Sequence, residues 1–197
     1  MAVFRRFSVG RFFTTSKPTP YDGERWALDN GAYSDFLQGS PFDVERFERN
    51  LAYAEELHRP DFVMLPDVVG DKETTLRWAD EWISRTWPWY LVIQDGMEPA
   101  DIAPFWKRLR GLFLGGTDKL KQDADMWCRV AHDKGKKFHY GRAGTPRKLS
   151  HAIRCGSDSA DSARLAMMTP KEYGHMLYLI HNPQAAFYVG DLLNIDD

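Results

Sequence analysis

The stretch WYLVIQDGMEPADIAPFWKRLRGLFLGG, residues 89–116, decides the fold. It contains an apolar run at 89–93, a segment of helical character at 99–109 and a second apolar run at 111–114. Two short apolar runs that are joined by a helix are typical of a β-α-β unit, in which the two strands lie parallel in one sheet. The stretch therefore predicts an α/β protein that is built on a parallel sheet.

The same alternation continues on both sides of this unit. Further strands are predicted around Leu28, Val63 and Phe138 and in a short piece at 159–165. Further helices are predicted at residues 41–57 (with Ser40 as N-cap), 72–87, 119–134 and 146–155, and a tail with helical character follows Thr169. Eight units of about 25 residues would account for the 197 residues. We therefore expect a single domain over residues 1–197 that forms a compact (β/α)8 TIM-type barrel, either trimmed or incomplete.

The composition excludes several classes of protein. The chain has 26 Lys and Arg against 28 Asp and Glu, a net charge of −2, and 43% of its residues are hydrophobic, which excludes disordered and collagen-like chains. No apolar run approaches the roughly 18 residues of a membrane span, and the first residues lack the apolar core of a signal peptide, so we expect a cytoplasmic protein. The only cysteines are Cys128 and Cys155, for which we expect reduced thiols and no Cys-rich zinc site.

The charge is distributed unevenly along the chain. Residues 43–101 hold 14 acidic and 6 basic residues, whereas residues 129–154 hold 8 basic residues and one acidic residue. A solvated helix face would have this composition, and so would a surface that binds phosphates. Arg142, Arg147 and Lys148 flank a glycine-containing turn that leads into a proline-initiated helix, whose free amides favour anions. We therefore predict that these three residues contact nucleic-acid phosphates.

Polar residues follow the predicted strands one after another. They are Asp29 and Asn30, Asp67, Gln94 and Asp95, Gly115 and Gly116, His139 and Arg142, and Asp158 and Asp161. A single Asp at such a position is ordinarily a helix cap. In parallel α/β proteins, however, the carboxyl ends of the strands meet at one edge, so six such positions in succession indicate a site.

The residue types at these positions suit chemistry at a glycosidic bond. One carboxylate can attack the anomeric carbon while a second carries a proton to or from the departing group. Two acids in one site repel each other, which keeps one of them protonated near neutral pH. The glycine pair allows backbone amides to approach a flat ligand, and Gln94 can donate and accept hydrogen bonds at a purine edge.

In their order, these segments resemble the tRNA-guanine transglycosylase superfamily, and more closely its short phage and bacterial branch, the DpdA-like 7-deazaguanine DNA transglycosylases. The resemblance runs from about Trp26 to Arg164. It rests on LDNGAY at 28–33, DFVMLPD at 61–67, LVIQDG at 91–96, LFLGGT at 112–117 and HYGRAGTPRKLSHAIRCGSDSADS at 139–162. The most telling part is GSDSAD at 156–161, behind the TPRKL helix.

This resemblance implies that the protein exchanges guanine in nucleic acid for a 7-deazaguanine such as preQ0, through a covalent bond between Asp161 and the sugar C1′. It implies that Asp29 is the acid and base that serves the two bases. Substrate binding falls to Asp67, Gln94, the amides of Gly115 and Gly116, and Asp158 as a neighbour of the nucleophile. We further expect Tyr33 to stack on the flipped base and His139 to orient a phosphate or the nucleophile.

Three departures from the family bear on the substrate. The chain is short, Asn30 and Ala32 replace small residues of the first motif, and no Cys-x-Cys-x2-Cys motif follows Asp161. We therefore expect neither the zinc-binding subdomain nor any cofactor, and DNA is favoured over tRNA. The expected partners are nucleic acid and a free base, in the host cytoplasm if a phage encodes the protein, with a homodimer as one assembly.

Three other functions remain open at this point. The first is a transglycosylase that acts on tRNA, because both nucleic acids present phosphates. The second is a catalytically silent homologue that only binds nucleic acid. The third is an α/β enzyme that acts on a small sugar phosphate through the turn at residues 141–148.

Overall fold

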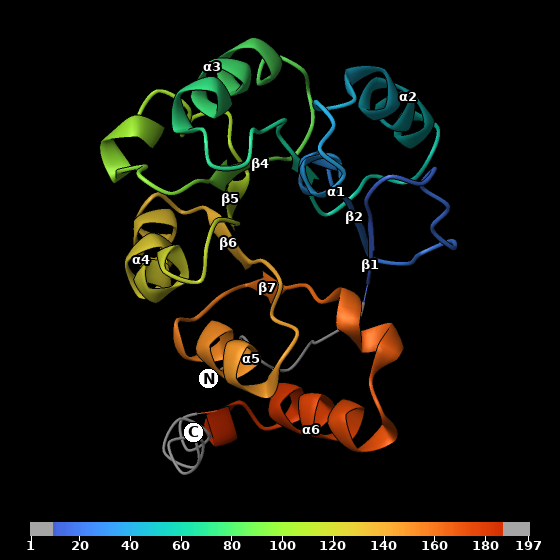
Figure 1. The fold of residues 1–197 in the computed structure, drawn as a ribbon, viewed down its shortest axis with the longest axis vertical. Helices are drawn as coiled ribbons and strands as arrows, with labels where there is room; N and C mark the ends of the chain where they lie inside the picture. The colour runs from blue at the N-terminus through green and yellow to red at the C-terminus, as the bar shows by residue number, and fades with distance from the viewer. Residues whose placement is uncertain (1–9, 187–197) are drawn as a thin grey trace.

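The computed structural model describes residues 10–186, which form one curled parallel sheet with helices outside it (Figure 1). The sheet has seven strands: β1 (Arg11–Phe13), β2 (Trp26–Leu28), β3 (Val63–Met64), β4 (Trp89–Ile93), β5 (Gly111–Leu114), β6 (Lys137–Tyr140) and β7 (Ser159–Ala160). Each strand pairs in parallel with its neighbours in chain order. Within the described residues no pairing joins β7 to β1. The parallel α/β class is confirmed, and the sheet is a half-barrel rather than a closed barrel.

Within residues 10–186, six α-helices accompany the strands: α1 (Ala32–Leu37), α2 (Val44–Glu55), α3 (Lys72–Trp82), α4 (Ala124–Asp133), α5 (Pro146–Arg154) and α6 (Pro170–His181). Short 3-10 turns lie at η2 (Pro99–Ile102), η3 (Leu120–Asp123), η4 (Ala163–Met167) and η5 (Pro183–Ala185). In Figure 1 the helices α2 to α5 lie outside the arc of strands, and α1 lies over its interior near β2.

The structure corrects several predicted boundaries. Asp43, and not Ser40, caps α2, because its side chain accepts a hydrogen bond of 2.9 Å from the Arg46 amide. The helix predicted at 99–109 is reduced to η2, since Pro104 cannot continue a helical hydrogen-bond pattern. Strand β1 and helix α1 were not predicted at all.

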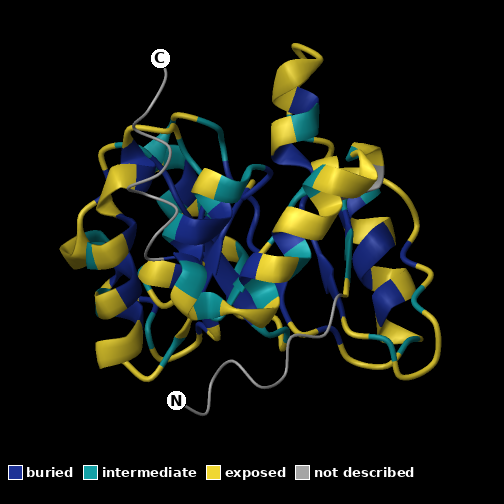
Figure 2. Ribbon diagram, turned by 90° about the horizontal axis from the view of Figure 1, so that it is seen from below, coloured by how far each residue is buried: buried dark blue, intermediate teal, exposed yellow. Residues whose placement is uncertain are grey.

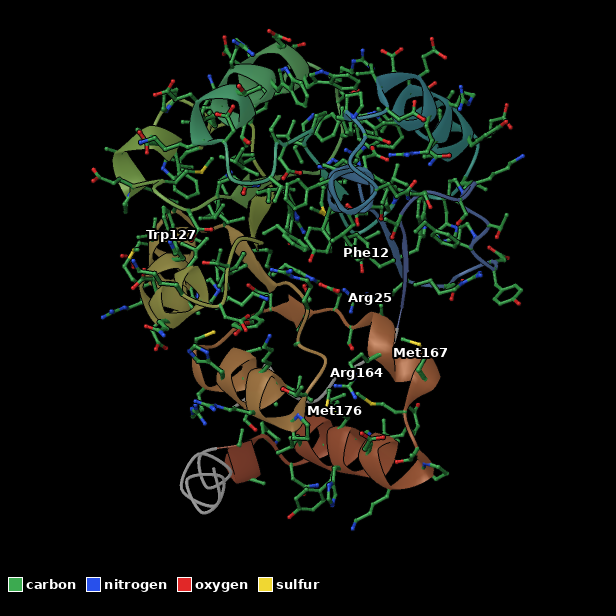
Figure 3. The ribbon with its side chains drawn as sticks, in the orientation of Figure 1. Phe12, Arg25, Trp127, Arg164, Met167 and Met176 are labelled. Atoms are coloured by element: carbon green, nitrogen blue, oxygen red, sulfur yellow. The ribbon has the colours of Figure 1, made fainter. Side chains whose placement is uncertain are left out.

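The strands separate two apolar cores. Side chains on the outer face of the sheet, among them Leu28, Val63, Leu91 and Phe138, belong to one core with apolar helix residues such as Trp127 of α4 (Figure 3). Side chains on the inner face form a second, smaller core of Phe12, Ala27, Phe62, Met64, Tyr90, Val92 and Phe113. Figure 2 shows the buried strands at the centre, with exposed helix surfaces around them. This alternation follows from the two-residue period of a strand.

The inner core explains why the sheet curls. Phe12 of β1 points toward the interior (Figure 3), and its ring centroid lies 5.9 Å from that of His139 in β6 and 6.1 Å from that of Phe113 in β5. These strands are not neighbours in the sheet. Phe62 stacks on Tyr90 at 4.3 Å, and Phe113 stacks on His139 at 4.7 Å. We call this layer of rings, formed by Phe12, Phe62, Tyr90, Phe113 and His139, the aromatic floor. Its contacts join β1 to β5 and β6 across the interior of the curled sheet.

Two further sequence expectations concern the cysteines and the membrane. Cys128 is buried and Cys155 is partly buried, and both are free thiols. Among the helices in residues 10–186, none combines the length and the apolar character that crossing a membrane requires.

Gly141 offers a test of the packing between β5 and β6. A Cβ atom at Gly141 would lie 2.7 Å from Cε1 of Phe113 and 2.9 Å from the Leu114 carbonyl oxygen. We expect Gly141→Ala to lower the free energy of unfolding by about 1–3 kcal/mol in urea denaturation, because the ring and the backbone must both shift. Gly174→Ala is the control, since nothing lies within 4 Å of a Cβ at this exposed position of α6. Equal effects of the two substitutions would contradict this packing.

Candidate active site at the carboxyl end of the sheet

A polar layer lies directly above the aromatic floor. The strand registers place Val92, Phe113, His139 and Ser159 side by side on the inner face. Two residues further along each strand, the inward positions belong to Gln94, Gly115, Gly141 and Asp161, and Asp29 follows Ala27 in the same way. Apolar side chains thus give way to acids, an amide and glycines at the carboxyl ends of the strands, where parallel α/β proteins hold their sites.

Asp67 is clamped between two side-chain amides. Asn30 Nδ2 donates to Asp67 Oδ1 at 2.6 Å, and Gln94 Nε2 donates to Oδ2 at 2.6 Å. All three side chains are buried. Burial raises the pKa of Asp67 to about 6, although the two amides oppose the shift. The loop after β3 is thereby tied to the ends of both neighbouring strands, and each carboxylate oxygen keeps a further lone pair for a ligand.

Asp29 has the highest pKa of the three carboxyl groups. Its Oδ1 accepts from the Gly31 amide at 3.2 Å in a turn that leads into α1. Burial and, to a smaller extent, the negative charges of Asp67 and Asp161 raise the pKa of Asp29 to about 7, against the hydrogen bond from the Gly31 amide. Repulsion of this kind requires the three carboxyl groups to lie around one volume. Asp29 therefore has the pKa of a general acid.

Asp161 is held in the opposite state. Burial opposes its charge, but His139, the Arg142 amide and the positive charge of Lys121 outweigh this and keep the pKa of Asp161 below its ordinary value. His139 Nε2 lies 3.1 Å from Asp161 Oδ1, and the Arg142 amide donates to the same oxygen at 3.0 Å. Both bonds end on Oδ1, which leaves Oδ2 as the atom available to react.

His139 and Ser159 support this carboxylate from below. His139 Nδ1 lies 2.8 Å from Ser159 Oγ, and its ring stacks on Phe113. The contact with Ser159 fixes Nδ1, and the stacking on Phe113 fixes the plane of the ring. The imidazole therefore presents Nε2 to Asp161 in one orientation. Of the two roles expected for His139, the structure places it next to the predicted nucleophile.

The remaining predicted ligand contacts lie at the rim. Arg142 is exposed, and its guanidinium donates to the Gly116 carbonyl oxygen and lies 4.8 Å from the Tyr33 ring centroid. Tyr33 in turn stacks on Phe36 with ring centroids 6.4 Å apart. Arg142 therefore bridges the ends of β5 and β6 to helix α1, over the polar layer. Gly115 and Gly116 belong to the strand end beneath this bridge.

The basic stretch at 129–154 is split between the two ends of the sheet. Arg142, Arg147 and Lys148 lie at the carboxyl end, where Lys148 pairs with Asp118 at 2.9 Å and Arg147 is exposed. Lys137 starts β6 at the opposite end. The basic residues of this stretch therefore do not form one surface. Arg142, Arg147 and Lys148 remain at the carboxyl end of the sheet.

Asp158 does not join the group, which corrects its predicted place beside the nucleophile. It precedes β7, and its carboxylate binds Lys137 Nζ at 2.6 Å, His132 Nε2 at 2.9 Å and the Phe138 amide at 2.9 Å. These partners belong to the amino end of β6 and to α4. Since β7 separates Asp158 from Asp161, the two acids lie at opposite ends of the sheet.

Two residues of the site escaped the sequence analysis. Asn30 stands among the polar residues that follow the predicted strands, but no role was predicted for it; its amide also donates to the Leu65 carbonyl oxygen at 2.6 Å, and its Oδ1 accepts from the Ala32 amide at 2.8 Å. A polar residue directly after a strand was the available signal. Lys121 is buried near Asp161, and nothing in the segment KLKQD distinguishes it from its exposed neighbours.

No metal site accompanies these groups in residues 10–186, where no three His, Cys, Asp or Glu side chains gather in a way that would hold an ion. Two surface hollows of about 570 and 560 Å³ are lined by other residues, beside α2 and at the amino ends of β4 to β6. The candidate site is therefore defined by its hydrogen bonds and charges.

Asp29 makes stability depend on pH in a predictable way. Its pKa of about 7 exceeds the ordinary value of 3.8, so the unfolded chain loses this proton first as the pH rises. The folded state is then destabilised progressively between these values and fully above pH 7. We expect Asp29→Asn to raise the free energy of unfolding at about pH 8 by about 2 kcal/mol more than at about pH 4. Urea denaturation at both pH values measures this, and a difference of the opposite sign would contradict the buried acid.

Comparisons with known proteins leave the family open. No family model matches the chain, and the search of curated proteins returns no significant match.

Proposed function

We propose that the protein is a base-exchange transglycosylase that replaces guanine in nucleic acid, with DNA favoured, by a 7-deazaguanine. The observation that carries this proposal is the gathering of Asp29, Asp67 and Asp161 at one end of the sheet, where Asp161 accepts two hydrogen bonds on Oδ1 and the pKa of Asp29 is raised. A protonated acid and an ionised carboxylate are the two groups that double displacement at a glycosidic carbon requires.

The first step breaks the bond between the sugar and guanine. Oδ2 of Asp161 attacks C1′, and the electron pair of the C1′–N bond passes to the departing guanine. Asp29 donates its proton to a ring nitrogen of that base, so guanine leaves as a neutral molecule. The products are a glycosyl ester of Asp161 and an ionised Asp29.

The second step reverses the same chemistry with a different base. The incoming 7-deazaguanine takes the position of guanine, and its ring nitrogen attacks C1′ while losing a proton to Asp29. The C1′–O bond breaks, and its electron pair returns to Asp161. Both residues recover their starting states, and the phosphate backbone stays intact.

Base recognition is assigned to the clamp around Asp67. A purine edge that carries N–H donors suits the free lone pairs of the Asp67 carboxylate, and Gln94 holds that carboxylate in place. The backbone at Gly115 and Gly116 has no side chain to obstruct a flat ring. Such polar groups discriminate strongly, because an analogue that lacks the donors would leave them unpaired.

The rim suits an extruded nucleotide and its neighbours. Tyr33 and Phe36 are exposed, which is uncommon for a stacked aromatic pair, and a base stacked on such a ring gains about 1–3 kcal/mol. A phosphate would compete with Gly116 for the Arg142 guanidinium, and Arg147 is exposed nearby in sequence. These groups favour a polymer over a free nucleoside. The preference for DNA comes from the resemblance to the short DNA-acting branch.

The central test measures base exchange directly. Purified protein is incubated with DNA or, separately, with tRNA and an isotopically labelled 7-deazaguanine, and the nucleosides are then analysed by mass spectrometry. We expect label in DNA with the wild type and a loss of at least about 1000-fold with Asp161→Asn, because no covalent intermediate can form. Asp125→Asn removes an exposed acid from α4 and serves as the matched control.

Each alternative has its own result. Label in tRNA alone would overturn the DNA assignment but keep the chemistry. Binding of nucleic acid without label in either polymer would indicate a silent homologue. Protection from unfolding by sugar phosphates, together with indifference to nucleic acid, would favour the sugar-phosphate enzyme.

The two carboxyl groups also predict a pH profile. Activity requires an ionised Asp161 and a protonated Asp29, so kcat/KM of the wild type should fall about tenfold per pH unit above about pH 7, where Asp29 loses its proton. Asp29→Asn should lower kcat/KM by at least about 100-fold and abolish this alkaline decline. Label incorporation over a range of pH values measures both effects, and a decline that persists in Asp29→Asn would assign it to another group.

A further inference from the structure

Lys121 has no role in the chemistry described above, although it is one of the few buried charged residues. It lies in η3 with 3% of its surface exposed. Lysine is seldom buried without a carboxylate partner. Here Nζ instead donates to the carbonyl oxygen of Gly141 and lies 5.1 Å from the ring centroid of Tyr140.

The Gly141 carbonyl oxygen, which accepts this hydrogen bond, belongs to the peptide group that contacts Asp161. The Gly141 carbonyl and the Arg142 amide form one planar, conjugated unit. Its N–H donates to Asp161 Oδ1 at 3.0 Å, while its oxygen accepts from Lys121. A hydrogen bond to the oxygen of a peptide group polarises its N–H, which then donates more strongly. Lys121 is thus connected to Asp161 through a single peptide bond.

The backbone at this point needs support. Arg142 has a φ of 58°, and it is the only residue other than glycine with a positive φ in residues 10–186. A non-glycine residue seldom adopts this left-handed conformation. The bonds at both ends of the peptide group hold its plane in the orientation that directs N–H toward Asp161. Without Lys121, this peptide group would keep a single hydrogen bond of its own, the one from its N–H to Asp161.

Lys121 is predominantly protonated at neutral pH, although its surroundings lower its pKa. Burial lowers its pKa to about 8, and the positive charges of Arg142 and Lys148 act in the same direction. Asp118 and Asp161 oppose them. The Tyr140 phenol, whose pKa burial raises to about 12, stays neutral.

We propose that Lys121 is a positioning residue for Asp161, which acts by orienting and polarising the Gly141–Arg142 peptide group so that its N–H holds Oδ1 of an ionised carboxylate. Its importance for catalysis rests on the proposed function, whereas its effect on the Asp161 carboxylate does not. Lys121 itself touches neither base nor sugar in this scheme.

The first experiment reads the carboxylate without any substrate. Protein labelled with ¹³C at the aspartate carboxyl carbons is titrated by NMR, and Asp161→Asn assigns the resonance. We expect the pKa of Asp161 to rise in Lys121→Met and to stay at the wild-type value in Lys119→Met, a matched loss of an exposed lysine two residues away. An unchanged pKa of Asp161 in folded Lys121→Met would overturn the proposal.

A second experiment leaves Lys121 in place, in case its substitution prevents folding. In Asp29→Asn, which removes the titration of the nearby Asp29 carboxyl group, the amide proton shift of Arg142 is followed against pH. It should change at about pH 8 as Lys121 loses its proton. The Ala143 amide, which donates to the backbone oxygen of Asp161 at 2.7 Å, is the internal reference and should change less. A flat Arg142 titration, or equal changes at both amides, would overturn the proposal.

Enzyme assays then separate positioning from substrate binding. If base exchange occurs, Lys121→Met should move the acid limb of kcat/KM to higher pH and leave KM for the free base unchanged. A raised KM with an unmoved limb would mean that Lys121 contacts substrate and would overturn the positioning role. If the wild type exchanges no base, the proposed function fails, and the two NMR titrations still decide the role of Lys121.

Discussion

The apolar aromatic floor inside the curled sheet is the constraint on which the rest of the structure depends. Because side chains alternate along each strand, the same registers that bury Val92 and Phe113 place the next inward residues directly above them. Acids at such positions lose much of their hydration and can ionise only where hydrogen bonds replace water. The chemistry of Asp29, Asp67 and Asp161 is set by which of them receives such bonds.

The three carboxyl groups share one environment and differ in their donors. Asp161 receives an imidazole nitrogen and an amide on one oxygen and has a lowered pKa, whereas Asp29 accepts a bond of 3.2 Å from the Gly31 amide and has a pKa raised to about 7. Asp67 lies between these extremes, with an amide on each oxygen. The proposed division into nucleophile, acid and binding group thus follows from the hydrogen-bond donors at the strand ends. A scaffold of this kind would carry out double displacement without a bound cofactor in the scheme proposed above.

Sequence patterns predicted the strand ends well and the edges of the sheet poorly. The apolar runs around Val63, Val92 and Phe113 are strong enough to define strands, and the residues that follow them therefore fall at one rim. Asp158 was misplaced because only two residues of β7 separate it from Asp161, and no pattern shows on which side of so short a strand an acid lies. Strand β1 has three residues, and its pairing with β2 and the open edge at β7 depend on contacts between distant segments. Lys121 was missed because its burial depends on the loop after β6.

The proposed chemistry requires that Asp29 and Asp161 differ in protonation. Infrared difference spectroscopy measures this difference without substrate. At about pH 5.5, between the ordinary pKa of Asp and that of Asp29, the wild-type spectrum is compared with those of Asp29→Asn and Asp161→Asn. The account predicts that Asp29→Asn loses the C=O band of a protonated carboxylic acid and that Asp161→Asn loses the bands of an ionised carboxylate. Loss of carboxylate bands in both variants would show that the two acids are equivalent and would contradict it.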